Sequence, residues 1–154
     1  MGSSVDGEVG YLTLADLGRR NVLSTELVGQ AQQAHEELIA AGARAGVLRV
    51  DGPVFCAVGD PDLARVTGLA RAEVAFIAEI HASRLFWVVA ADGAVLGAGI
   101  SLMLTRPYLV LTDRSSLAVP NSHPDGGHVG RRVPAGNAQG ATFVGLNRMS
   151  CPCY

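Results

Sequence analysis

The sequence has no lysine and a small share of charged residues. Charged side chains make up 17% of the 154 residues, whereas globular domains carry about 25%. The net charge is only −2, so the chain lacks the strongly basic character typical of nucleic-acid-binding domains. Hydrophobic residues reach 49% and the mean hydropathy is +0.28, which excludes intrinsic disorder. Such a chain either buries a large core or needs a partner surface.

Cysteines and long apolar runs are also scarce. Cys56 lies far in the sequence from Cys151 and Cys153, so no disulfide framework is expected. The apolar stretches 85–91 and 94–104 are too short to span a bilayer. The N-terminal residues have neither a basic nor an apolar targeting region. We therefore expect no membrane contact and a cytoplasmic location.

Strand-like and helix-like segments alternate along the chain. Strands are predicted at 10–14, 47–50, 86–91, 108–111 and 117–119, with 86–91 apolar enough to be buried on both faces. Helices are predicted at 25–41 and at 62–84, and the second of these could be interrupted at Gly68. Residues 94–99 are expected to open a third helix that continues to about 105. Residues 138–146 are predicted to be weakly helical. This alternation indicates an α/β fold with largely parallel pairing.

The first long predicted helix has recognisable ends, and both long helices carry polar residues. Ser24 is the expected N-cap of the first helix and Gly42 its C-terminal stop. His35 lies beside two glutamates in that helix, so a solvated position is expected for it. A solvated face is also expected for the acidic residues of the second helix, namely Asp62, Glu73 and Glu79.

Two glycine-containing loops, 57–60 and 97–99, follow predicted strands. Small residues allow a ligand to approach the backbone, and two N–H groups aimed at one oxygen would form an oxyanion hole. The alternative is that Gly97, Ala98 and Gly99 only allow close packing of a helix on a strand. A nucleotide-binding loop is excluded, because the third glycine of GxGxxG and the GxxxxGK[ST] pattern are both missing.

Four short motifs follow one another along the chain: RNVLS at 20–24, FCAVGDPDL at 55–63, VVAADGAVLGAG at 88–99 and PDGG at 124–127. In this order they resemble the crotonase, or enoyl-CoA hydratase/isomerase, family, whose members carry RNALS, FCAGADL, VIAAVNGAALGGG and PDGG. The family's PDGG segment precedes a basic helix, where this chain has Arg131 and Arg132. The resemblance covers residues 8–150.

The resemblance implies a crotonase-like ββα spiral core that binds a coenzyme A thioester as substrate and needs no other cofactor. Backbone N–H groups of Gly59 and Ala98 match the oxyanion hole that polarises the thioester carbonyl and stabilises an enolate. The positions matched to the segments that hold coenzyme A are Asn21, Val22, Leu23, Ala57, Gly59 and Asp60.

The catalytic positions depart from the family pattern. Ser101 and Asn121 stand where family hydratases have two glutamates, and neither side chain can act as a general base at neutral pH. Val58 replaces a family glycine before the first oxyanion donor, and its β-branch resists a positive φ. Replacement acids or bases nearby in the sequence are His123 and Asp125, with Asp92, Asp113 and His128 as further candidates; the alternative is that these side chains face solvent.

The sequence predicts one core domain, 1–150, followed by a cysteine-containing tail, 151–154. Family members continue into a C-terminal helical region that closes the acyl pocket and builds a trimer, so we expect the C-terminally truncated core to lack it. Exposed apolar surface would then favour a homo-oligomer, or a hetero-oligomer with a related subunit. The two tail thiols leave a tetrahedral metal site half filled, so no metal site is expected.

Three functions fit these features. The first is a lyase or isomerase of fatty acid metabolism that acts on an acyl-CoA with reassigned catalytic residues. The second is a pseudoenzyme, which binds coenzyme A thioesters or assembles with a full-length relative without turnover. The third is a degenerate reading frame with no function of its own. The pair Ser101 and Asn121 discriminates between the first two functions, because a scaffold that had lost only its bases would gain hydratase activity from glutamate at both positions.

Overall fold

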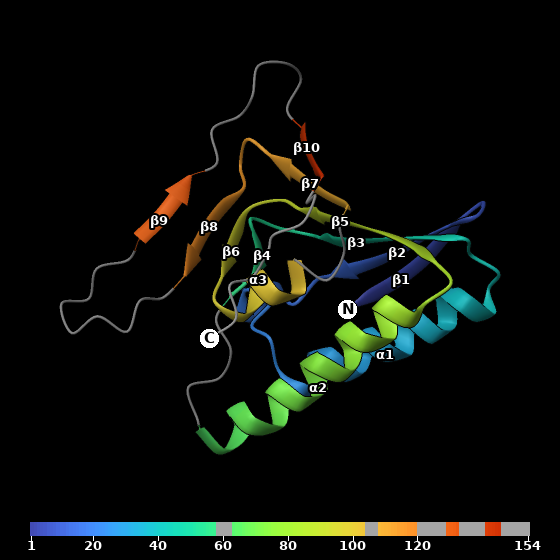
Figure 1. Cartoon of the computed structure of the whole chain (residues 1–154), viewed down its shortest axis with the longest axis horizontal. Coiled ribbons are helices and arrows are strands. Elements are labelled where there is room, and N and C mark those ends of the chain that lie inside the picture. Colours follow the sequence, from blue (N-terminus) through green and yellow to red (C-terminus); the bar gives the residue numbers. More distant parts are fainter. Residues whose placement is uncertain (58–62, 104–107, 120–128, 133–140, 146–154) are drawn as a thin grey trace.

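The described strands form two sheets, and the larger sheet shares the hydrophobic core with the helices. The structure, a computed structural model, describes residues 1–57, 63–103, 108–119, 129–132 and 141–145. In this part of the chain the larger sheet has the order β1-β2-β3-β5-β7-β10 (Figure 1). Strands β2, β3, β5 and β7 pair in parallel, and β1 and β10 are antiparallel at the edges. The bounds are β1 Gly2–Asp6, β2 Val9–Leu14, β3 Ala45–Val50, β5 Phe86–Ala91, β7 Tyr108–Thr112 and β10 Ala141–Gly145.

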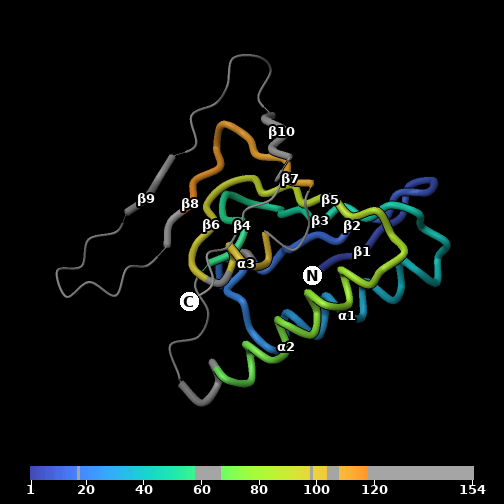
Figure 2. The backbone as a smooth tube through the Cα atoms, viewed as in Figure 1, coloured from blue at the N-terminus to red at the C-terminus, as the bar shows by residue number. Residues whose placement is uncertain are grey.

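The smaller sheet is built from short strands, of which β4, β6 and β8 each follow a strand of the larger sheet. Its order among the described residues is β4-β6-β8-β9, with parallel pairing from β4 to β8 and antiparallel pairing of β9 on β8. The chain therefore passes from β3 to β4, from β5 to β6 and from β7 to β8, as Figure 2 shows. The bounds are β4 Val54–Cys56, β6 Ala94–Leu96, β8 Ser116–Val119 and β9 Val129–Arg132.

Helices complete the repeating unit. The long helix α2, Leu63–Ala82, follows β4, and the short helix α3, Ala98–Met103, follows β6. Helix α1, Thr25–Ala40, begins after a 3-10 turn, Leu17–Arg19, and lies beside α2 (Figure 1). Two successive β-β-α units, β3-β4-α2 and β5-β6-α3, thus confirm the predicted ββα spiral core.

The ends of α1 follow directly from its sequence. The Ser24 hydroxyl accepts a hydrogen bond from the Leu27 N–H at 3.1 Å, which satisfies one of the free donors of the first turn. Gly42 follows the helix with φ +80°, the left-handed conformation that ends many helices. The buried face of α1, which includes Leu27, Ala31 and Leu38, joins the core. The predicted N-cap and the predicted stop are both confirmed.

Several elements differ from the sequence prediction. Residues 54–56, for which no strand was predicted, form β4, and residues 94–96 form β6 instead of opening a helix. Residues 141–145, predicted as weakly helical, form β10 against β7, and Arg131 and Arg132 lie in strand β9 instead of a basic helix. Strand β1 was not predicted. Helix α2 runs through Gly68 without a break.

Strand β5 and helix α1 also differ from the prediction in burial. Strand β5 alternates between buried and partly exposed residues, and Phe86 is 53% exposed, so the strand is not buried on both faces. His35 is only 5% exposed and stacks on Trp87, with 5.6 Å between the ring centroids. The prediction of a solvated His35 is therefore wrong: packing on the Trp87 ring outweighs the influence of the two neighbouring glutamates.

None of the helices in the described part of the chain is long and apolar enough to cross a membrane.

Candidate functional site

Strand β4 is the element around which the candidate site is built, and Asn21 fixes the preceding loop to it. The Asn21 side chain is buried, its amide Nδ2 donates to the Val54 carbonyl oxygen at 2.8 Å, and its Oδ1 accepts from the Asp16 N–H at 2.7 Å. The residue has φ +51°, a conformation that asparagine tolerates better than most residues. The hydrogen bond to Val54 therefore joins the segment that contains Asn21 to the first residue of β4.

Gly93 allows the chain before β6 to approach the chain before β4 closely. It has φ +85°, and a Cβ at this position would lie 2.1 Å from the Pro53 carbonyl oxygen. That oxygen accepts a hydrogen bond from the Ala94 N–H at 3.0 Å. Only glycine satisfies both the close approach and the positive φ.

Gly99 likewise allows a close approach, in this case of helix α3 to strand β4. A Cβ on Gly99 would lie 2.7 Å from the Cys56 Cβ and 2.8 Å from the Cys56 carbonyl oxygen. The helix therefore begins directly against the end of β4, with Ala98 as its first residue and Gly97 at φ +55° before it. The backbone N–H of Ala98 belongs to the first turn, whose donors have no partner within the helix. The close packing that was one alternative for residues 97–99 is thus present, and it places Ala98 beside the end of β4.

Cys56 lies at this junction but is not a nucleophile. It is fully buried, and its thiol donates to the Ala57 carbonyl oxygen at 3.5 Å. Burial, and then the negative charge of Glu73, raise the pKa of Cys56 to about 12. The side chain is therefore a neutral thiol at physiological pH, and nucleophilic attack needs the thiolate.

Glu73 and Ser101 form a polar pair between α2 and α3 that sequence reasoning missed. Glu73 is half-buried, and the exposed Ser101 hydrogen-bonds to its carboxyl group. Burial raises the pKa of Glu73 above its ordinary value, and the Ser101 hydrogen bond partly counteracts this. The prediction that Glu73 lies on a solvated helix face is wrong, whereas Glu79, two turns later, is exposed as predicted. The position matched to a family glutamate, Ser101, thus holds a hydroxyl that contacts a carboxyl from another helix.

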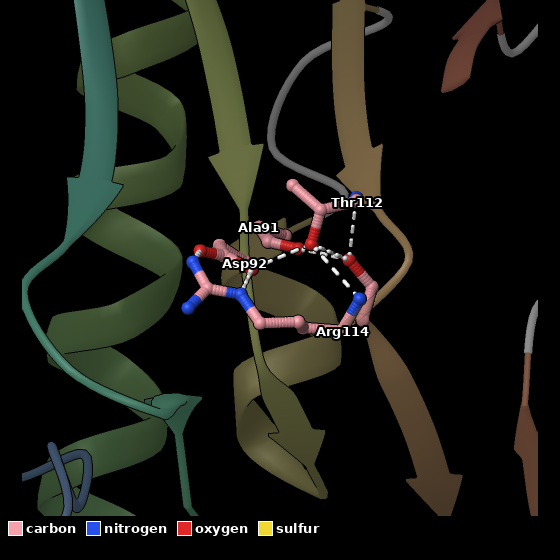
Figure 3. A network of polar contacts seen from close by, with 5 residues as sticks. Ala91, Asp92, Thr112 and Arg114 are labelled. Atoms are coloured by element: carbon pink, nitrogen blue, oxygen red, sulfur yellow. Dashed lines mark hydrogen bonds and ion pairs between the residues drawn. The ribbon is translucent and has the colours of Figure 1, made fainter. Parts of the chain in front are cut away.

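The Asp92 carboxylate is held in a network of polar contacts and is not a free catalytic group. It pairs with Arg114, whose Nε lies 3.1 Å from Asp92 Oδ1, and it accepts a hydrogen bond from Thr112 (Figure 3). The Ser115 hydroxyl donates to the Ala91 carbonyl oxygen at 2.7 Å in the same network. These contacts connect the end of β5 to the turn after β7. The exposed Asp113 lies in that turn.

The remaining predicted site residues divide into two groups. Leu23 is buried and lines a small apolar cavity with Phe76 of α2 and Leu102 of α3, whereas Val22 and Ala57 are partly exposed. Among the described residues there is no group of three or more metal-ligating side chains. Several predicted residues lie outside the described part of the chain: Val58, Gly59, Asp60, Asp62, Asn121, His123, Asp125 and His128.

Comparison with solved structures identifies the fold. An enoyl-CoA hydratase from Mycobacterium avium is similar, with 35% identity over 73% of this chain and 45% of that one and a TM-score of 0.68. An enoyl-CoA hydratase/isomerase from Marinobacter aquaeolei is 22% identical over 78% of this chain and 51% of its own (TM-score 0.68). Human enoyl coenzyme A hydratase domain-containing protein 3 is 17% identical, and the match covers 77% of this chain and 50% of that protein (TM-score 0.71). The chain thus spans about half the length of these structures.

Two further comparisons found nothing. No family model matches the chain, and no curated protein matches it. The solved structures nevertheless confirm the resemblance predicted from the four motifs, because they are enoyl-CoA hydratases and isomerases that share the β-β-α architecture described above.

Proposed function

Because the chain has the fold of the crotonase (enoyl-CoA hydratase/isomerase) family, we propose that it binds an acyl-CoA thioester and stabilises the enolate of that thioester. One observation carries the proposal: the loop that contains Asn21 and the start of α3 both pack on β4. Asn21, from the first segment matched to coenzyme A binding, and the helix that begins with the matched oxyanion donor Ala98 therefore both contact strand β4. The second donor is Gly59, three positions after Cys56 in the sequence.

The chemistry follows from the backbone. Two N–H donors aimed at the thioester oxygen stabilise the negative charge that develops there when a proton leaves C2. Loss of one such donor costs about 3 kcal/mol of transition-state stabilisation in enzymes that use an oxyanion hole. The donors are main-chain groups, so the replacements Ser101 and Asn121 leave this part of the site in place. Coenzyme A would be held by residues 21–23 and by Ala57, Gly59 and Asp60.

Calorimetric titration of the purified chain tests this proposal. Crotonyl-CoA and acetyl-CoA are the ligands, and free adenosine and a thioether analogue without the carbonyl group are the controls. Saturable binding that is tighter for the thioesters than for the thioether supports a site that recognises the carbonyl oxygen. Absence of binding from a folded, monodisperse sample contradicts the proposal.

A second candidate function is a subunit that holds a thioester, or assembles with a related chain, without turnover. It is favoured by the outer face of α2, where Val74 is 65% exposed and lies with Ala70, Ala75 and Ala78 around an open, mostly apolar hollow. Exposed apolar patches of this kind often mark contact surfaces. Light scattering after size exclusion, combined with a hydration assay on crotonyl-CoA, separates the two candidates: turnover by the chain alone supports the enzyme.

A further inference from the structure

Glu73 has a carboxyl group whose surroundings a purely structural role does not explain. Its Oε1 atom is buried and has no hydrogen-bond partner among the described residues. A buried polar atom without a partner costs about 1–3 kcal/mol. Glu79, in the same helix, instead lies at the surface and accepts a hydrogen bond from Gln32 at 2.6 Å. The chain thus keeps a carboxyl group in a place where an apolar residue or a glutamine would be less costly.

Three elements of the candidate site meet at this carboxyl group. Ser101 of α3 hydrogen-bonds to it, and its charge acts on the Cys56 thiol of β4. Gly99 packs α3 directly on Cys56, and Phe76, almost one turn after Glu73, shares an apolar cavity with Leu102 of α3. Glu73 therefore lies beside the short helix that begins with Ala98. Because Ser101 is exposed, the pair lies at the border between the core and solvent, where a ligand can reach it.

We propose that Glu73 is the proton-transfer group of the thioester site, and that Ser101 is a positioning residue that orients its carboxylate. This inference rests on the proposed function, because it needs an acyl-CoA bound with its carbonyl oxygen on Ala98. The Glu73 carboxylate acts as the general base, a role that the Ser101 and Asn121 side chains cannot fill. It reaches the site from α2 instead of α3.

The step balances with the groups present. The Glu73 carboxylate removes a proton from C2 of the thioester: the C2–H bond breaks, a Glu73 O–H bond forms, and the electron pair moves to the carbonyl oxygen to give the enolate. The reverse step returns the proton to C2. In deuterium oxide the acidic proton of Glu73 exchanges with solvent, so the returning step places deuterium on C2. Burial raises the pKa of Glu73 toward the working pH, which suits a general base.

The test measures binding and exchange on the same proteins. Butyryl-CoA, which has no double bond to hydrate, is titrated calorimetrically, and the incorporation of deuterium at C2 is followed by proton NMR. The proteins are the full chain, Glu73→Gln, Glu73→Asp, Ser101→Ala, and the control Glu36→Gln on the exposed face of α1. We expect Glu73→Gln to bind within about twofold of the unaltered chain and to lose about 100-fold or more in exchange rate.

The other variants show how the pair works. Glu36→Gln is expected to exchange like the unaltered chain, and Glu73→Asp is expected to exchange faster than Glu73→Gln because it keeps a carboxyl group. Ser101 lowers the pKa of Glu73, so Ser101→Ala is expected to move the pH midpoint of exchange upward. A merely structural Ser101 would change stability without moving this midpoint.

The outcomes separate this inference from the proposed function. If no protein binds butyryl-CoA, the proposed function itself is wrong. If the chain binds butyryl-CoA but exchange is absent, or is equally fast in Glu73→Gln, the assignment of Glu73 is overturned while thioester binding stands. Loss of exchange in Glu73→Gln with binding retained, together with a shifted midpoint in Ser101→Ala, supports the assignment.

Discussion

Gly99 of α3 and Cys56 of β4 are packed so closely that a Cβ on Gly99 would lie 2.7 Å from the Cys56 Cβ and 2.8 Å from its carbonyl oxygen. The carbonyl oxygen belongs to the backbone and cannot move aside as the end of a flexible side chain can. This contact sets the distance between the helix that begins with Ala98 and strand β4. The position of the candidate oxyanion donor thus depends on the absence of one side chain.

Gly99→Ala is expected to lower the free energy of unfolding by about 1–3 kcal/mol, the usual cost of overpacking. Urea unfolding followed by circular dichroism measures the change. The matched control is Gly68→Ala in α2, where the new Cβ meets nothing within 4 Å. Because alanine favours the helix interior, the control is expected to gain about 0.5–1 kcal/mol. Equal effects of the two variants would show that the contact with Cys56 is unimportant.

Asn21→Ala is expected to destabilise the chain by about 1–3 kcal/mol for each partner that it leaves unsatisfied. The partners are the Asp16 N–H and the Val54 carbonyl oxygen. Asn21→Gly removes the same hydrogen bonds but tolerates φ +51°, so it is expected to be less destabilising than alanine by about 1 kcal/mol. Thermal unfolding of both variants checks this order, and the reverse order would show that the backbone conformation carries no cost.

Cys56 is expected to be inert in the folded chain, because its pKa is about 12 and its side chain is fully buried. A Cys151→Ser, Cys153→Ser variant leaves Cys56 as its one thiol. Reaction with a chromogenic disulfide at pH 8 is expected to be negligible in the native state and complete in guanidinium chloride. Rapid reaction in the native state would contradict the described burial of the β4–α3 junction.

Glu73→Gln is expected to gain stability relative to the unaltered chain as the pH rises. Burial raises the pKa of Glu73 above the ordinary 4.5, so the folded protein holds this proton more tightly than the unfolded chain does. The free energy of unfolding therefore falls as pH rises from the ordinary value through the raised one. Glutamine removes this fall. Urea unfolding between pH 4 and pH 8 measures the free energy of unfolding of both proteins. Parallel plots of this free energy against pH for the variant and the unaltered chain would contradict the prediction.

Local sequence signals predicted the elements that depend on local chemistry. Ser24 predicted the start of α1, and the order of strands and helices predicted an α/β fold, because caps and apolar periodicity act within a few residues. Strands β4 and β6 are only three residues long, too short for a periodic pattern, and their pairing is set by the contact at Gly93. Strand β10 is specified by its pairing with β7 instead of its own composition.

Burial was harder to predict than secondary structure. His35 and Glu73 each lie in a helix with polar neighbours, and a helical pattern does not show which long-range partner reaches a given side chain. The ring of Trp87 covers His35, and Ser101 of α3 meets Glu73 of α2. The one signal in the sequence for the contact between Ser101 and Glu73 was Ser101 itself, because it has a hydroxyl group where the crotonase family has a carboxylate.

The measurement that tests the central claim most directly is the carbon-13 resonance of an acyl-CoA labelled at the thioester carbonyl, recorded free and bound to the chain. Hydrogen bonds from two backbone N–H groups polarise the carbonyl bond. The expected result is therefore a downfield shift of the bound carbonyl resonance while the other acyl resonances move little. Binding without any movement of the carbonyl resonance would show that the site holds coenzyme A but has no oxyanion hole.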